Sequence, residues 1–240
     1  MVFRVIRYEL KRSLPIYAVW AATAIMLAVI ARLKVFSLSD MPLIYLMIFS
    51  SVGIMLYRYY QTMHGAEASF LFTINISSGK QLIVRYISLL IWSLFTVLLI
   101  GVVMLIQGEK MGLLIQSLSF TMKMLLLAEV TFSIFVLVIM ICVPLTLSNI
   151  QPFSQRRILS FVILGAIIFG GFSLLTKTTE RFIPAYLIVT NTGNIFIDSM
   201  LSIPESFAFS FNTLLWNVIT TVIFMITIPI VIRKKLLCFR

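Results

Sequence analysis

Residues 82–106 read LIVRYISLLIWSLFTVLLIGVVMLI, an apolar run in which Arg85 is the one charged residue. The hydrocarbon core of a bilayer is about 30 Å thick, and an α-helix crosses it with about 20 predominantly apolar residues. A run of this length, with its charge close to its beginning, predicts a transmembrane helix.

The rest of the chain has the same character. Of its 240 residues, 61% are hydrophobic and 11% are charged, whereas an ordinary soluble domain has about 25% charged residues. The apolar runs do not alternate with polar residues, so helices rather than barrel strands are expected. We predict an all-α integral membrane protein with one transmembrane domain. Its six spans are expected at residues 14–31, 41–57, 82–106, 124–147, 158–176 and 209–232.

The net charge of +11 is distributed unevenly along the chain. Most of the 19 basic residues lie before the first predicted span, between the second and third spans, between the fourth and fifth spans, and after the sixth. By the positive-inside rule, these segments are cytoplasmic. We therefore expect a multi-pass protein of the cell membrane, in a bacterial plasma membrane, with both termini in the cytoplasm. This topology accounts for the basic excess, so no nucleic acid partner is expected.

The leader, residues 1–13, has helical periodicity. Apolar and basic residues fall on two different faces, with Phe3, Ile6 and Leu10 on one and Arg4, Arg7 and Lys11 on the other. This pattern is typical of an amphipathic helix that lies on membrane lipid at the inner interface. A charged leader that only sets the orientation of the first span has the same spacing. In either case Pro15 is expected to bend the chain at the start of that span.

The longest predicted outer segment is residues 177–208. It contains two apolar stretches, FIPAYLIV and IFIDSML, which are each too short to cross a bilayer. We expect them to dip into the outer leaflet or to pack as short helices over the mouth of the protein.

Several kinds of chemistry are missing from the sequence. His64 is the only histidine, which excludes a metal site built from several histidines. The Gly-Lys pair at residues 79–80 is not a P-loop, because Ile74 stands where that motif requires glycine. The chain is therefore not expected to be an enzyme or to bind a cofactor. Work driven by ATP would need another polypeptide.

Glu129 is an acidic residue inside a predicted span. A carboxylate at membrane depth is a functional candidate, either on a polar translocation path or at an interface between protomers. The second interpretation is structural: Glu129 lies toward the outer boundary, where it could reach the interface or pair with Lys123.

Residues 63–86, MHGAEASFLFTINISSGKQLIVRY, interrupt the apolar runs on the predicted cytoplasmic side. After Gly65, the stretch AEASFLFTI is typical of a short helix in which Phe70, Leu71 and Ile74 share a face. Glu67 lies near the positive end of its dipole, and NISSGK supplies turn residues. A short amphipathic helix between two spans can lie on the membrane or contact a soluble partner.

This segment resembles the coupling-helix region of type-2 ABC permeases, the export-type membrane subunits of ATP-binding cassette transporters. The family pattern runs Glu, Leu, Thr-Leu-Pro, Ser-Arg and then Lys at the head of the third span. The corresponding residues here are Glu67, Phe70 to Thr73, Ile74 and Asn75, Ser77 and Ser78, and Arg85. The chain departs from the pattern at Asn75 and Ser78. The opening RVIRYELKR is also similar to the basic amphipathic start of these permeases.

The resemblance implies a function and a set of partners. A coupling helix that includes Glu67, Phe70, Leu71, Thr73 and Ile74 would dock on separate ATPase subunits, with Arg85 at its exit. ATP and Mg²⁺ would be bound by those subunits, and a second permease, identical or homologous, would complete the transporter. The expected activity is export of, or immunity to, an amphipathic peptide or antibiotic.

Two other functions remain open at this point. One is the membrane substrate-binding component of an uptake system, which would need an outward pocket with convergent polar groups. The other is a membrane scaffold or sensor that transports nothing.

Overall fold

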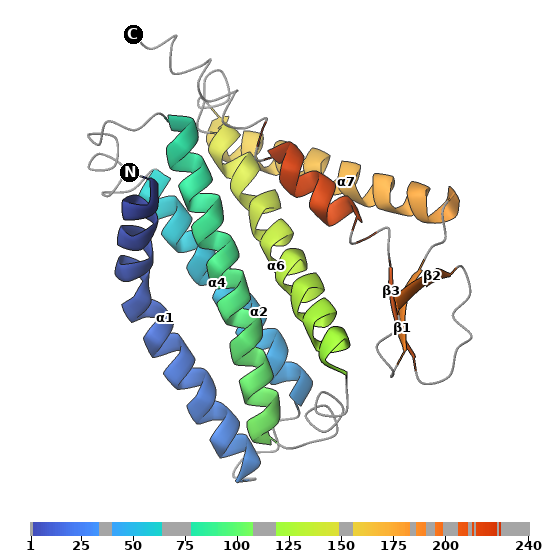
Figure 1. The fold of residues 1–240 in the computed structure, drawn as a ribbon. Helices are drawn as coiled ribbons and strands as arrows, with labels where there is room; N and C mark the ends of the chain where they lie inside the picture. The colour runs from blue at the N-terminus through green and yellow to red at the C-terminus, as the bar shows by residue number, and fades with distance from the viewer. Residues whose placement is uncertain are drawn as a thin grey trace.

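The structure is a computed structural model, and its main body is a bundle of long helices (Figure 1). The residues that it describes are 2–33, 40–63, 78–107, 119–148, 156–182, 186–190, 195–198, 206–210, 213, 215–224 and 226. All structural statements below concern these residues.

Five helices are long and apolar enough to cross a membrane. They are α1 (Val2–Arg32), α2 (Asp40–Met63), α4 (Ser78–Gln107), α6 (Phe120–Ser148) and α7 (Arg157–Phe182). Each contains one predicted span and extends beyond it, so the first five predicted spans are confirmed as helices. For the sixth, the described residues include a shorter apolar helix, Leu215–Phe224. The remainder of that predicted span, up to residue 232, lies largely outside the described residues.

The leader and the first span form one continuous helix with Pro15 inside it. A proline removes one intrahelical hydrogen bond but does not have to end a helix. The predicted bases Arg4, Arg7 and Lys11 are exposed, as expected. Phe3, on the face predicted to contact lipid, is 86% exposed. The buried positions are Val5, Glu9, Ser13 and Tyr17, which recur every four residues. The leader therefore packs against the bundle along these positions, and the predicted contact of its apolar face with membrane lipid stays a prediction.

The helices α1, α2, α4 and α6 lie side by side, with α1 and α4 running in one direction and α2 and α6 in the other (Figure 1). The start of α1, the end of α2, the start of α4 and the end of α6 consequently share one end of the bundle, which we call the basic end. It carries bases on three of these helices, including Arg7, Arg58 and Lys80. At the opposite end, the Arg32 guanidinium donates a hydrogen bond of 2.7 Å to the carbonyl of Ile106.

Small residues bring α1 close to its neighbours in the half of the bundle away from the basic end. Ala24 and Ala28 are buried on one face of α1, and Ala28 has no exposed surface. They form a cluster with side chains of α2 and α4, among them Leu43 and Val103. Lipid tails are as apolar as leucine, so the hydrophobic effect does not drive helices together inside a membrane. Small side chains let the helix backbones approach closely, and the resulting van der Waals contacts stabilise the packing.

The helix α7 projects away from the bundle and is covered much less (Figure 1). None of the described side chains of its apolar stretch is buried. Helix Leu215–Phe224 contacts both α6 and α7. The indole of Trp216 donates a hydrogen bond of 2.7 Å to Thr179, and the Asn217 amide donates one of 3.3 Å to Ser133.

Residues expected to dip into the outer leaflet or to form short helices contain β-strands instead. The strands β1 (Tyr186–Thr190), β2 (Ile195–Asp198) and β3 (Ser206–Ser210) form an antiparallel sheet in the order β2-β1-β3. β3 includes Phe209, where the sixth span was predicted to begin. The all-α expectation therefore holds for the long helices and is wrong for this sheet. Strands of four or five residues rich in Ile, Val, Tyr and Phe match β-propensity better than helix propensity.

Candidate functional site

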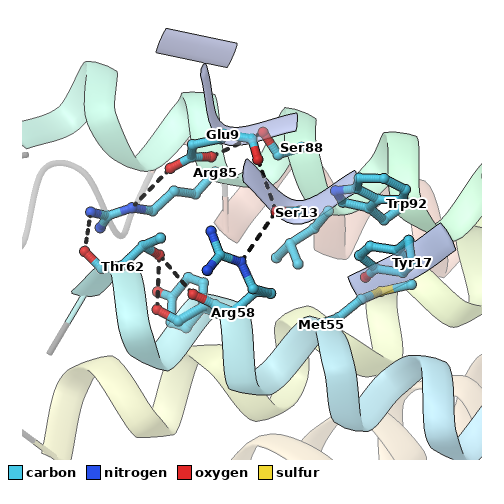
Figure 2. A pocket seen from close by; sticks show the side chains of 11 residues that line it. Glu9, Ser13, Tyr17, Met55, Arg58, Thr62, Arg85, Ser88 and Trp92 are labelled. Carbon is cyan, nitrogen blue, oxygen red and sulfur yellow. Dashed lines mark hydrogen bonds and ion pairs between the residues drawn. The ribbon is translucent and has the colours of Figure 1, made fainter. Parts of the chain in front are cut away.

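At the basic end, α1, α2 and α4 meet around a buried arginine, Arg85 (Figure 2). The helix α4 directly follows residues 64–77, and Arg85 lies in its second turn. Only 4% of the surface of Arg85 is exposed. A charge removed from water in this way is stable only when other groups neutralise and hydrogen-bond it.

Two other helices supply these groups. The Nε atom of Arg85 lies 3.7 Å from a carboxylate oxygen of Glu9 on α1. Its Nη2 atom donates a hydrogen bond to the backbone carbonyl of Thr62, in the last turn of α2. Ser88, one turn further along α4, donates to the other oxygen of Glu9 at 3.0 Å. One guanidinium therefore joins the leader, the end of α2 and the start of α4. We call these residues, Glu9, Thr62, Arg85 and Ser88, the Arg85 cluster.

A second arginine lies next to the Arg85 cluster. The Nε atom of Arg58 donates a hydrogen bond of 3.2 Å to the Ser13 hydroxyl, which itself donates to the carbonyl of Glu9 at 2.8 Å. Two guanidinium groups thus line the same cavity with one carboxylate, Glu9. Glu9 is consequently the one acidic group among the described lining residues that can compensate this positive charge.

The cavity at the Arg85 cluster is small. Its volume is about 30 Å³, which has room for ordered water and not for an organic substrate. The Tyr17 hydroxyl is buried in its wall and has no hydrogen-bond partner among the described residues, so a water there would satisfy it. No group of three His, Cys, Asp or Glu side chains in the described ranges could hold a metal ion. The arrangement suits a structural junction better than a catalytic or ligand site.

Below this cavity the bundle is held by aromatic packing and a buried hydrogen bond. The rings of Tyr17 on α1 and Trp92 on α4 are stacked, with centroids 3.6 Å apart and an interplanar angle of 3°. The hydroxyls of Tyr59 on α2 and Thr146 on α6 are 2.6 Å apart and share a hydrogen bond. The first contact joins α1 to α4, and the second joins α2 to α6.

Of the residues predicted to bind a partner, Arg85 alone lies within the described part of the chain. Glu67, Phe70, Leu71, Thr73 and Ile74 lie outside it. The buried guanidinium of Arg85 is directed into the bundle toward Glu9 and Thr62 (Figure 2). The Arg85 side chain joins the helix ends on both sides of residues 64–77, and a role for it in binding a partner stays a prediction.

Sequence reasoning missed Glu9, Ser13, Thr62 and Ser88. Glu9 is the one acid in a strongly basic leader, and Ser13 follows it at a spacing of four residues on the same helical face. That spacing was a usable signal for a buried polar face. Its partner could not be identified in this way, because Arg85 is on another helix.

Glu129 lies at a separate place, on an open groove between α2 and α6. The groove encloses about 400 Å³ and is lined by Ile48 of α2 together with Glu129, Val130, Ser133, Ile134 and Leu137 of α6. Glu129 is partly exposed there. It is six residues from Lys123, a separation that puts the two on different faces of α6. This geometry argues against the pairing with Lys123, and a functional role for Glu129 stays a prediction.

The chain was also compared with known proteins. No family model, no curated protein and no solved structure matches it. The functional assignment consequently rests on its own residues and their geometry.

Proposed function

We propose that this chain is the transmembrane subunit of an ATP-binding cassette transporter, which exports or gives immunity to an amphipathic peptide or antibiotic. It would act with a second permease, identical or homologous, and with separate ATPase subunits that bind ATP and Mg²⁺. The five membrane-type helices support the membrane part of this proposal. The resemblance of residues 67–85 to a coupling region supports the rest.

The Arg85 cluster is the observation that carries the proposal. Residues 64–77 connect the end of α2 to the start of α4, and Arg85 bonds to both the Thr62 carbonyl at the first end and Glu9 of α1. Force applied to this segment by a partner would reach three helices at once through one side chain. ATP can bias such a movement only if the segment makes different contacts in the two states of the transporter.

The basic end of the bundle is proposed to face the cytoplasm. It combines exposed leader bases on α1, Arg58 on α2 and Lys80 on α4, which is the distribution that the positive-inside rule describes. Residues 64–77 would then lie on the side where ATP is available.

The uptake alternative receives less support. A vitamin-binding component needs an enclosed pocket with several convergent polar groups. The cavity at the Arg85 cluster has a volume of about 30 Å³, and the larger groove at Glu129 is mainly apolar.

The proposal is tested by identifying the companions of the chain. The protein is tagged in its native host, purified gently in detergent, and analysed by mass spectrometry for stoichiometric partners. The expected result is an ATP-binding cassette subunit at an equal ratio. Repeated purification of the folded chain without such a subunit would contradict the proposal and favour a scaffold or sensor. Recovery of one tightly bound vitamin would favour uptake.

A further inference from the structure

The groove at Glu129 combines an acid with apolar walls at membrane depth. α6 begins at Phe120, so Glu129 lies about 14 Å along the helix axis at a rise of about 1.5 Å per residue. Its neighbours in the groove are the aliphatic side chains of Ile48, Val130, Ile134 and Leu137, with the Ser133 hydroxyl one turn away. A carboxylate in this position faces a mainly hydrocarbon surface.

None of the described residues lining the groove is basic. Ser133, the other polar residue in the lining, already accepts a hydrogen bond from the Asn217 amide. An ionised side chain inside a membrane is costly and is normally paired or faces a polar cavity. Among the residues that the structure describes, the lining of the groove does not supply the positive charge.

We propose that the groove binds a lipophilic organic cation, with the charged group at Glu129 and the apolar body along α6 between Val130 and Leu137. A volume of about 400 Å³ falls within the range of small-molecule sites, about 300–1,000 Å³. Because the groove is open at the side of the bundle, such a ligand can enter from the bilayer. The charge selects cations over anions, and the aliphatic walls select amphiphiles over hydrophilic cations.

This inference rests on the proposed function in one respect: it names the chemistry of the transported molecule, an amphiphile with an amine, guanidinium or other cationic group. Binding itself requires no ATPase. The two proposals can therefore fail separately.

The test uses tetraphenylphosphonium as the probe, because it is apolar and carries a permanent positive charge. Equilibrium dialysis measures its binding to the full chain in nanodiscs made of zwitterionic lipid, with empty nanodiscs as background. We expect saturable binding that Glu129→Gln weakens by about tenfold or more. The matched control is Glu180→Gln, which removes an exposed carboxylate from the end of α7 and should leave binding unchanged.

A second variant separates loss of charge from misfolding. Val130→Trp keeps the carboxylate but fills the groove, so it should also abolish binding. The elution volume in size-exclusion chromatography checks the fold of each variant. Tetraphenylborate, an anion of similar shape, is dialysed separately, because it forms an insoluble salt with the cation, and it should show no saturable binding.

Three results would overturn the inference. The first is equal binding by the wild type and Glu129→Gln. The second is equal binding of tetraphenylborate when it is dialysed alone, which would show partitioning into an apolar surface. The third is absence of binding together with efficient disulfide cross-linking of Leu137→Cys between two chains, which would make the groove an interface between copies. The companion experiment above would be unaffected by any of them.

Discussion

The Nε atom of Arg85, in the second turn of α4, lies 3.7 Å from the carboxylate of Glu9 in the leader, and both side chains are buried. The same guanidinium donates to the carbonyl of Thr62 at the end of α2. The leader and the entry to the third span are therefore joined by a buried ion pair, and breaking such a pair is strongly destabilising.

Removing Glu9 should destabilise the protein strongly. Glu9→Gln removes the carboxylate from the buried Glu9–Arg85 pair, and breaking a buried pair costs about 3–5 kcal/mol. Thermal unfolding in a mild detergent, followed by circular dichroism, measures the change. Arg58→Gln is the control, because it keeps the Glu9–Arg85 pair, and it should lower the midpoint less. Equal midpoints for the two variants would contradict a dominant role for the ion pair.

The segment 64–77 should couple ATP hydrolysis to transport if the proposed function holds. Glu67→Lys and Phe70→Asp reverse the character of two residues expected to contact the ATPase. We expect the variant protein to reach the membrane in normal amount and ATP hydrolysis to continue, while export falls to background. Both activities are measured in proteoliposomes that contain the complete complex. If the variants export as much per ATP hydrolysed as the wild type, these residues do not couple ATP hydrolysis to transport.

The orientation in the membrane should place the sheet outside the cell. We expect an impermeant maleimide to label Thr190→Cys, in β1, on intact cells and to label Gln155→Cys only after permeabilisation. Cys238 is first changed to serine to remove a background thiol, whereas Cys142 is buried and can remain. The opposite labelling pattern would invert the topology and place residues 64–77 outside.

The close approach of α1 to its neighbours should be sensitive to side-chain volume. Ala28 has no exposed surface in its cluster with Leu43 and Val103, so Ala28→Leu should destabilise the bundle by about 1–3 kcal/mol, which is typical of overpacking. Ala22→Leu makes the same chemical change on an exposed face of the same helix and should have little effect. The unfolding midpoints of the two variants are measured side by side. An equal decrease in both midpoints would show that α1 is not closely packed against α2 and α4.

Residue patterns predicted the long helices well because apolar length is a local property. The runs in α2, α4, α6 and α7 are each long enough to cross a bilayer and are bounded by polar residues. The same reasoning failed for Tyr186–Thr190, where a short apolar stretch suits a strand as well as a helix. Its pairing with Ile195–Asp198 and Ser206–Ser210 decided the outcome, and strand pairing cannot be read from one segment.

The site was predictable only in part, for the same reason. Arg85 was identified from its position at the head of a span, whereas the groups that its side chain contacts could not be read from the sequence. Its burial depends on Glu9, far away in the sequence. Glu129 was identified because an acid in an apolar run is unusual, but its groove requires Ile48 of a different helix.

By itself, the sequence determined that the chain forms long membrane-type helices and that its basic residues collect in alternate connecting segments. The thickness of the hydrocarbon core and the free-energy cost of placing a charge inside it act on each stretch of the chain independently. Only the tertiary structure decided that Glu9, Thr62 and Arg85 meet at one point and that Glu129 opens onto an apolar groove. Those contacts depend on how α1, α2, α4 and α6 pack, since a buried charge is compensated by whichever helix lies beside it.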